Sequence, residues 1–450
     1  MSKIVDAVTI ALTCGDELLM VYRQPFLKAF PGYHAFPGGK IDAADSDGAA
    51  LPAFCDGHEP RLLRGLMREL QEELGVDLAQ YETITLRALG AALTPPNMAV
   101  RFNTHFFLVA LPHKPQITVD LNEIGRADWA QPAEWLARYR SGEALMAPPT
   151  RAVVEALAAD IAASEIPGFD FRTRIDFELP LIEPIHGVRN ILVRSHTLPP
   201  AENTNCFLLG DSQSHRVLVD PSPADDGELD KLCRLVERLG IHEVFLTHHH
   251  PDHHERAPDL ARRFGVPIGM SADTQQRLHE KKGRDYFHGL VVHHYREGDV
   301  LCRWRNRPVQ VLEVPGHDEG HLALMPDNRA WCIVGDLIQG IGTVVIAKPE
   351  GDMRKYFATL ERLIEINPRA IVPSHGTALG TVYRLEETLK HRRLREQQVL
   401  SLWREGRDLE SMLRVIYADV DPRLLGLARM NIESHLDKLR AEGVLDGAAA

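Results

Sequence analysis

Short apolar runs alternate with polar turns over most of the chain, and helical periodicity replaces this pattern towards the end. Within 1–165, the runs VTIALTC, ELLMVYR and THFFLVAL predict strands, while LLRGLMRELQEEL predicts an amphipathic helix. A second alternation of strands and helices occupies 187–378, and 379–450 is helical throughout. The pattern predicts a multidomain α/β chain with domains at 1–165 and 187–378, a linker and first strand at 166–200, and a helical tail at 379–450.

Composition narrows the class of protein. The 450 residues are 44% hydrophobic and 25% charged, the balance of a globular protein. A formal net charge of −12 argues against non-specific binding to nucleic acid or to an anionic membrane. No run approaches the ~20 apolar residues of a membrane helix, so we expect no membrane association. The six cysteines are scattered without a CxxC pair, which predicts reduced thiols and a cytoplasmic location.

Ligand-type side chains gather in THHHPDHH, residues 247–254, directly after the strand-like run EVFLT. His248 and His250 alternate along an extended segment and therefore point the same way, whereas His249 points away. Pro251 then turns the chain into a helix and adds Asp252 and His253. Imidazole nitrogens and carboxylate oxygens without a thiolate suit zinc, iron or manganese, and the ligand types do not choose among them.

Three further candidates each follow a strand-like run: His317 in VPGHDEGH, Asp336 in CIVGDL and His375 in AIVPSHG. Together with THHHPDHH, this order resembles the metallo-β-lactamase superfamily over about residues 203–376. The resemblance implies an αββα four-layer sandwich with a two-metal site at one edge of the sheets.

The resemblance also implies a role for each residue. His248, His250 and His317 correspond to the ligands of the first metal; Asp252, His253 and His375 to those of the second; Asp336 to a bridging carboxylate; and Asp220 to an aspartate that supports the metal loop. The cysteine of the β-lactamases proper is replaced by Asp336, as in the glyoxalase II and ribonuclease Z branches, which argues against antibiotic hydrolysis. His249 is expected outside the ligand set or at the surface, and His321 beside the ligands rather than among them. His254, on the first helical turn, is expected not to touch the site.

Two bound ions, zinc by expectation and manganese or iron as alternatives, would lower the pKa of a bridging water and so supply hydroxide as the nucleophile. Asp252 would orient this hydroxide or receive its proton. Such a centre hydrolyses thioesters, lactones or phosphodiesters, and the ligands alone do not decide which.

A second group of candidates lies on the helix that contains RELQEELGV. Glu69, Glu72 and Glu73 are spaced i, i+3 and i+4, so they share one face, and clustered carboxylates suit Mg²⁺ or Mn²⁺. Gly75 is expected to cap the helix. A solvated acidic face is the alternative interpretation.

With Gly39 and Arg68, these glutamates resemble the Nudix box. That resemblance implies an α/β/α sandwich over about residues 5–160 and metal-dependent cleavage of nucleoside diphosphate derivatives, with Glu72 and Glu73 as catalytic residues. Arg23 corresponds to a phosphate contact and Glu123 to a late base. The 28 residues between Gly39 and Arg68 (40–67) exceed the spacing in the family's box, which puts catalysis, more than the fold, in doubt.

The tail resembles the winged-helix-like tail of metallo-β-lactamase-like proteins that include endoribonucleases. It has a basic run, KHRRLR at 390–395, yet equal numbers of basic and acidic residues overall, which favours helix packing or a partner contact over binding of nucleic acid. Three functions follow: hydrolysis of small-molecule thioesters or esters, cleavage of RNA, or a Nudix domain that senses nucleotides without turnover. The oligomeric state is left open.

Overall fold

The computed structural model describes residues 4–48, 50–94, 101–163, 165–166, 169, 178–211 and 213–445. Contacts within the chain divide it into two units, Met1–Arg189 and Asn190–Ala450. The predicted boundaries of the domains, the linker and the tail stay predictions. Across the described residues, no helix has both the length and the apolar composition needed to cross a membrane.

The first unit is built on one six-stranded sheet of order β3-β2-β1-β5-β4, with β6 paired to β2. Its strands are β1 (Ile4–Cys14), β2 (Glu17–Arg23), β3 (His34–Ala35), β4 (Thr85–Leu93), β5 (Arg101–Leu111) and β6 (Ile124–Ala130). Its helices are α1 (Pro60–Leu74), α2 (Pro132–Arg140) and α3 (Pro148–Ala159).

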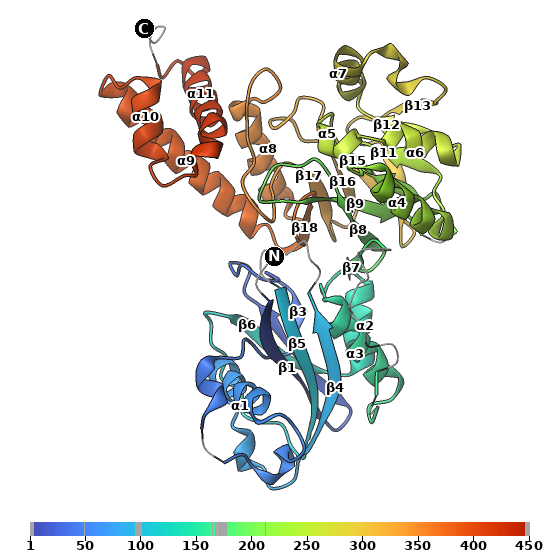
Figure 1. Ribbon diagram of the computed structural model, residues 1–450, viewed down its shortest axis with the longest axis vertical. Coiled ribbons are helices and arrows are strands. Elements are labelled where there is room, and N and C mark those ends of the chain that lie inside the picture. Colours follow the sequence, from blue (N-terminus) through green and yellow to red (C-terminus); the bar gives the residue numbers. More distant parts are fainter. Residues whose placement is uncertain are drawn as a thin grey trace. The chain divides into compact units, whose positions relative to one another are not determined.

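Both faces of this sheet are buried, and the apolar side chains of β1 point alternately to one face and the other. Val8 and Ile10 pack with the leucines of α1, and Ala11 packs with residues of α2 and α3 on the opposite face. Helices therefore cover both faces, which is the predicted α/β/α sandwich (Figure 1). Gly75 ends α1 in the left-handed region at φ 66°, as the cap prediction required.

The second unit contains a six-stranded sheet of order β14-β15-β16-β17-β18-β19 and most of a seven-stranded sheet of order β13-β12-β11-β10-β9-β8-β7, whose strand β7 precedes Asn190. The strands of the seven-stranded sheet, called the first sheet, are β7 (Leu181–Ile185), β8 (Val188–Arg194), β9 (Asn203–Leu209), β10 (Val217–Val219), β11 (Glu243–Phe245), β12 (Ile268–Met270) and β13 (Val292–His294). The strands of the six-stranded sheet, called the second sheet, are β14 (Val300–Trp304), β15 (Arg307–Glu313), β16 (Leu322–Pro326), β17 (Cys332–Gly335), β18 (Ala370–Pro373) and β19 (Leu379–Gly380).

Helices accompany both sheets of this unit and form its tail (Figure 1). They are α4 (Asp226–Leu239), α5 (Pro251–His254), α6 (Ala257–Phe264), α7 (Ala272–Lys282), α8 (Met353–Ile366), α9 (Tyr383–Arg404), α10 (Leu409–Ile416) and α11 (Leu425–Ala441). Apolar residues of α8, such as Tyr356 and Leu360, share a core with the second sheet. The end of α9 shares a separate core with α10 and α11.

Strand ends at one edge of each sheet position the candidate ligands. Strands β10 and β11 are parallel, so Asp220 and the segment after β11 leave the first sheet at the same edge. Strands β17 and β18 are also parallel, and Asp336 and His375 follow them. The predicted strand EVFLT is two residues longer than β11, which ends at Phe245.

Candidate metal centre

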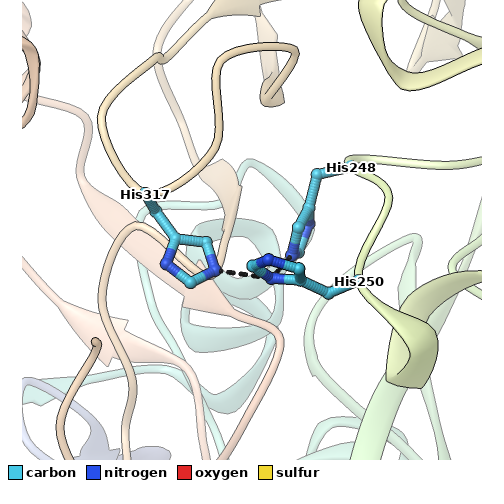
Figure 2. A group of neighbouring side chains, drawn as sticks. All are labelled: His248, His250 and His317. Carbon is cyan, nitrogen blue, oxygen red and sulfur yellow. Dashed lines mark hydrogen bonds between the residues drawn. The ribbon is translucent and has the colours of Figure 1, made fainter. Parts of the chain in front are cut away.

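Three histidine rings from two loops converge on one point (Figure 2). The Nδ1 atom of His250 lies 3.0 Å from Nε2 of His248 and 2.9 Å from Nε2 of His317. His248 is fully buried, His317 nearly so, and His250 partly exposed. The structure thus brings together the three residues that the sequence assigned to a first metal.

The nitrogen on the far side of each ring has its own partner. Nδ1–H of His317 donates to the carbonyl of Val345 at 3.0 Å, and Nε2–H of His250 donates to Glu350 at 3.2 Å. Nδ1 of His248 lies 3.0 Å from the Thr247 hydroxyl. A hydrogen bond at one ring nitrogen fixes the tautomer and leaves the other nitrogen with a lone pair that faces inward.

The three inward nitrogens carry lone pairs that only an electrophile can satisfy together. Burial, followed by the neighbouring histidine charges, holds the pKa of His248 well below its usual value and lowers that of His317 to about 4. Three imidazole nitrogens at these separations suit a cation that binds nitrogen at about 2.0–2.1 Å.

A second group joins Asp252, His253, His375 and Asp336. Nε2 of His375 lies 3.3 Å from Oδ2 of Asp252 and 3.2 Å from Oδ1 of Asp336. Nε2 of His253 lies 3.8 Å and 3.6 Å from the same two oxygens. The other oxygen of Asp336 is 3.9 Å from Nε2 of His317, so this carboxylate lies between the two groups.

Several buried polar atoms of the second group have no hydrogen-bond partner among the described residues: Nε2 of His253, Nε2 of His375 and Oδ1 of Asp336. Buried polar atoms without partners are rare and need an explanation. All three point at one another, and two nitrogens with carboxylate oxygens form a donor set for a divalent transition metal. The residues present therefore fit a bound cation.

The charges of the carboxylates in the second group also favour a bound cation. Burial opposes ionisation of Asp252, yet the charges of His253 and His375 lower its pKa to about 2. Burial likewise opposes protonation of His375, but Asp336 and Asp252 raise its pKa to about 10. Without a metal, protons on these histidines balance the buried carboxylates.

Asp220 holds the loop that carries the ligands. Its carboxylate accepts the backbone N–H of Thr247 at 2.8 Å, the Thr247 hydroxyl at 2.7 Å and Nδ1–H of His253 at 2.8 Å. Its backbone φ of 50° lies in the left-handed region, which aspartate tolerates better than most residues. The contacts agree with the supporting position that the sequence predicted for Asp220.

The remaining histidines of the motif occupy different environments. His249 is fully buried and lies 2.5 Å from Asp318 and 3.1 Å from Glu350, so the expectation that it could be a surface group was wrong. Alternation gave its direction correctly, but Asp318 and Glu350 cover that side. His254 turns to the hydroxyl of Tyr286 at 2.7 Å.

His321 is fully buried, with its ring centroid 4.8 Å from that of His248. Neither of its ring nitrogens has a hydrogen-bond partner in the part of the chain that the structure describes. Glu350 and Asp318 were missed by sequence reasoning: Asp318 lies in VPGHDEGH but was not singled out there, and Glu350 belongs to none of the quoted motifs.

The Nudix-like residues form a separate cluster in the first unit. Glu73 is buried, and its Oε2 accepts the backbone N–H of Gly38 at 2.8 Å, while its Oε1 has no partner among the described residues. Burial raises the pKa of Glu73 to about 8 and also raises that of Glu69. A Cβ at Gly39 would lie 2.4 Å from the Glu69 carboxylate, which explains the glycine.

Arg68 is held by the long segment that separates it from Gly39. Its guanidinium contacts Asp45 through Nε and Nη2, each at 3.0 Å, and Nη1 contacts Glu69 and Glu72 at 2.9 Å. Glu72 points outward, with 59% of its side chain exposed. Among the described residues, the groups whose ligand atoms all lie within 4.8 Å of one another belong to the second unit, and none of them includes Glu69, Glu72 or Glu73.

Comparison with known proteins follows this division of the chain. Residues 199–375 match the Metallo-beta-lactamase superfamily, residues 3–149 match the NUDIX domain, and residues 409–446 match the Beta-lactamase associated winged helix domain. The matches make the chain an enzyme of the hydrolase class. More closely, it combines a NUDIX domain, a metallo-beta-lactamase superfamily domain and a winged helix domain, as the three resemblances predicted.

Individual proteins similar to this chain include two curated relatives and one solved structure. A Beta-lactamase-like protein 2 homolog of Drosophila melanogaster is 29% identical over 268 residues, which are 54% of this chain and 84% of that protein. A Hydroxyacylglutathione hydrolase of Hamiltonella defensa subsp. Acyrthosiphon pisum is 29% identical over 180 residues, 39% of this chain and 63% of that protein. The crystal structure of a Beta-lactamase domain protein from Burkholderia ambifaria superposes with a TM-score of 0.49 at 23% identity, covering 58% of this chain and 88% of that one.

Proposed function

We propose that the second unit hydrolyses thioesters or esters of small molecules with two divalent cations, zinc by preference and iron or manganese as alternatives. The observation that carries the proposal is the set of buried atoms without partners on His253, His375 and Asp336, beside three imidazoles that face one another. His248, His250 and His317 would hold one ion, and Asp252, His253 and His375 the other. Asp336 would contact both.

The bound ions would lower the pKa of a water and polarise the oxygen of the bond under attack. The chain itself supplies orientation. Asp252 stays ionised because its pKa is about 2, and its side chain is partly accessible, so it can accept a hydrogen bond from the attacking water. The hydrogen bonds of His317, His250 and His253 to their outer partners orient the inward nitrogens towards the proposed ions.

The proposed substrate class rests on two independent arguments. The relative from Hamiltonella is named for hydrolysis of hydroxyacylglutathione, and we extend its chemistry to this chain. The net charge of −12 and the neutral tail disfavour a polyanionic substrate such as RNA. A thioester or ester of a small molecule therefore suits this site better than a nucleic acid.

Metal analysis and a substrate panel test this proposal. Full-length protein should contain close to two transition-metal ions and hydrolyse an acyl thioester, and His250→Ala should abolish this activity. His294→Ala, at an exposed histidine outside the two groups, is the control and should behave as wild type. Near-zero bound metal would refute the centre. Cleavage of single-stranded RNA, lost in His250→Ala, with no thioester turnover would favour the endoribonuclease alternative.

We propose separately that the first unit cleaves nucleoside diphosphate derivatives with Mg²⁺ or Mn²⁺. The observation that favours this is Glu73, a buried carboxyl with an unpaired oxygen and a pKa of about 8, which a cation would stabilise in its ionised form. Glu69 and Glu72 would complete the ligands, and Glu72 or Glu73 would orient the attacking water. Glu73→Gln should abolish diphosphate hydrolysis. Nucleotide binding without turnover in the wild type would support the sensor alternative instead.

A further inference from the structure

The loop between β17 and α8 lies between the candidate metal centre and the C-terminal helices. It faces the centre at two points: the carbonyl of Val345 accepts from His317 at 3.0 Å, and the Glu350 carboxylate accepts from His250 at 3.2 Å. Two of the three inward-facing histidines therefore owe their orientation to this loop. Its own position must be fixed for those hydrogen bonds to persist.

The residues on either side of Val345 are held by the tail. The backbone N–H of Ile346 donates to Oδ1 of Asn431 at 3.2 Å, and the Ser434 hydroxyl donates to the carbonyl of Ile346 at 2.6 Å. Arg392 on α9 donates from Nη2 to the carbonyl of Val344. Lys348 adds an ion pair with Asp437 at 2.7 Å.

These contacts alternate along the loop. Residues 344, 346 and 348 face α9 and α11, whereas the Val345 carbonyl faces His317. An extended segment presents successive groups to opposite sides, so one side can be anchored while the other serves the centre. The tail thus contacts the residues on either side of Val345, which set the direction of the Val345 carbonyl.

Arg392 connects the tail to the centre by a second route. Its guanidinium lies 5.7 Å from the ring centroid of Tyr356, whose hydroxyl donates to the carbonyl of Leu337 at 2.8 Å, and Leu337 follows Asp336. It also donates to Asn431 at 3.1 Å. Arg392 is only 4% exposed, and no acidic side chain lies within ion-pair distance of it among the described residues.

Burying a cation that contacts only neutral oxygens and a ring costs free energy, so stability alone does not explain Arg392. Its geometry is better explained by position, because a planar guanidinium can grip several acceptors in fixed directions. We propose that Arg392, Asn431 and Ser434 are positioning residues: the C-terminal helices fix the loop at 344–350 and thereby the rings of His317 and His250. The inference rests on the proposed metal centre, which it deepens by assigning the tail a role in metal affinity.

The test measures metal affinity in the metal-depleted full-length protein by titration with Co²⁺ and with Zn²⁺, alongside thermal stability. Asn431→Leu removes the acceptor shared by Ile346 and Arg392. Loss of an outer partner typically weakens metal binding about 10- to 100-fold, and since Asn431 acts through the backbone we expect about tenfold. The loss should affect the ion held by His248, His250 and His317 and leave the other ion unchanged. Asn431→Asp keeps the acceptor and should restore wild-type affinity.

Lys438→Met is the matched control. Lys438 also joins α11 to α9, through Glu396 at 2.8 Å, but it does not touch the loop. It should lower stability without changing the affinity for either ion. Should Asn431→Leu fail to fold, Ser434→Ala, which removes a single hydrogen bond to the loop, takes its place with a smaller loss of affinity expected for the same ion.

Three outcomes overturn the inference. Equal losses of affinity in Asn431→Leu and Lys438→Met would mean that the tail stabilises the unit only in general. Wild-type affinity in a folded Asn431→Leu, or in Ser434→Ala where that variant takes its place, would mean that the loop needs no anchor. A wild-type protein that binds no metal would overturn the proposed function, and this inference with it, whereas the first two outcomes leave the proposed function intact.

Discussion

Replacing Asp220 by asparagine gives the sharpest test of how the loop after β11 is organised. Asp220 is fully buried and accepts three hydrogen bonds: two from Thr247 and one from His253. Asparagine has the same shape, but one of its two terminal groups donates instead of accepting. The variant therefore changes the hydrogen-bond chemistry of the loop without leaving a cavity.

Each orientation of the new amide is unfavourable. If its NH₂ group faces His253, then His253 must move its proton from Nδ1 to Nε2, the nitrogen needed for the metal. If the NH₂ group faces the backbone N–H of Thr247, two donors oppose each other in a buried place, which costs about 1–3 kcal/mol. The first orientation should weaken the second ion about 10- to 100-fold, equivalent to about 1.4–2.7 kcal/mol.

Chemical denaturation of the metal-depleted protein and titration with Zn²⁺ measure the two quantities. Glu228→Gln is the matched control, because Glu228 is also a buried carboxylate that accepts a backbone N–H, from Arg194 at 3.0 Å, away from both groups. It should lower stability and leave metal affinity unchanged. If Asp220→Asn keeps both its free energy of unfolding and its affinity for two ions, then Asp220 does not organise this loop.

Three further predictions follow from buried groups. Burial lowers the pKa of His34 to about 4, so on acidification the unfolded chain takes up this proton before the folded chain does. The free energy of unfolding should therefore be full above about pH 6.5 and fall by about 3 kcal/mol towards pH 4. In His34→Gln, denaturation at several pH values should show a weaker dependence of this free energy on pH. Gly335→Ala places a Cβ 2.1 Å from the His321 ring at φ 55° and should lower the free energy of unfolding by about 2–4 kcal/mol. The control Gly265→Ala, at φ 64° with open space around it, should lower it by only about 1 kcal/mol in the same denaturation assay. The His375 proton, with a pKa of about 10, must leave when the second ion binds, and although burial opposes protonation of His253, the neighbouring carboxylates raise its pKa as well. The affinity for that ion should therefore rise at least about tenfold per pH unit between pH 7 and 9, and calorimetry in buffers of different ionisation enthalpy that detects no proton release would contradict this.

The convergence of the candidate ligands was predictable from the sequence because the order of their motifs resembles a known superfamily and the motifs follow strand-like runs. Alternation separated His248 and His250 from His249, and the structure agrees on their directions. The sequence could not show that the other side of His249 is also buried. Asp318 and Glu350 provide that cover, and Glu350 lies 101 residues from His249 in the chain.

Other parts of the site leave no signature in a side-chain pattern. The partner of His317 is the backbone carbonyl of Val345, and any residue could supply it. In the first unit, the long spacing before Arg68 looked like an interruption of the box. Asp45, which lies within this spacing, instead forms two hydrogen bonds with the Arg68 guanidinium, a contact that only the tertiary structure reveals.

The two ligand groups differ in charge, and the difference explains how they are supported. The first group consists of three histidines, and its geometry depends on hydrogen bonds from outside, which the loop at 344–350 provides for His317 and His250. The second group contains two carboxylates, Asp252 and Asp336, that attract a cation or protons directly, and its outer carboxylate, Asp220, directly follows β10 of the first sheet. An anchored loop matters more where charge attracts less, and the C-terminal helices contact the loop that supports the three histidines.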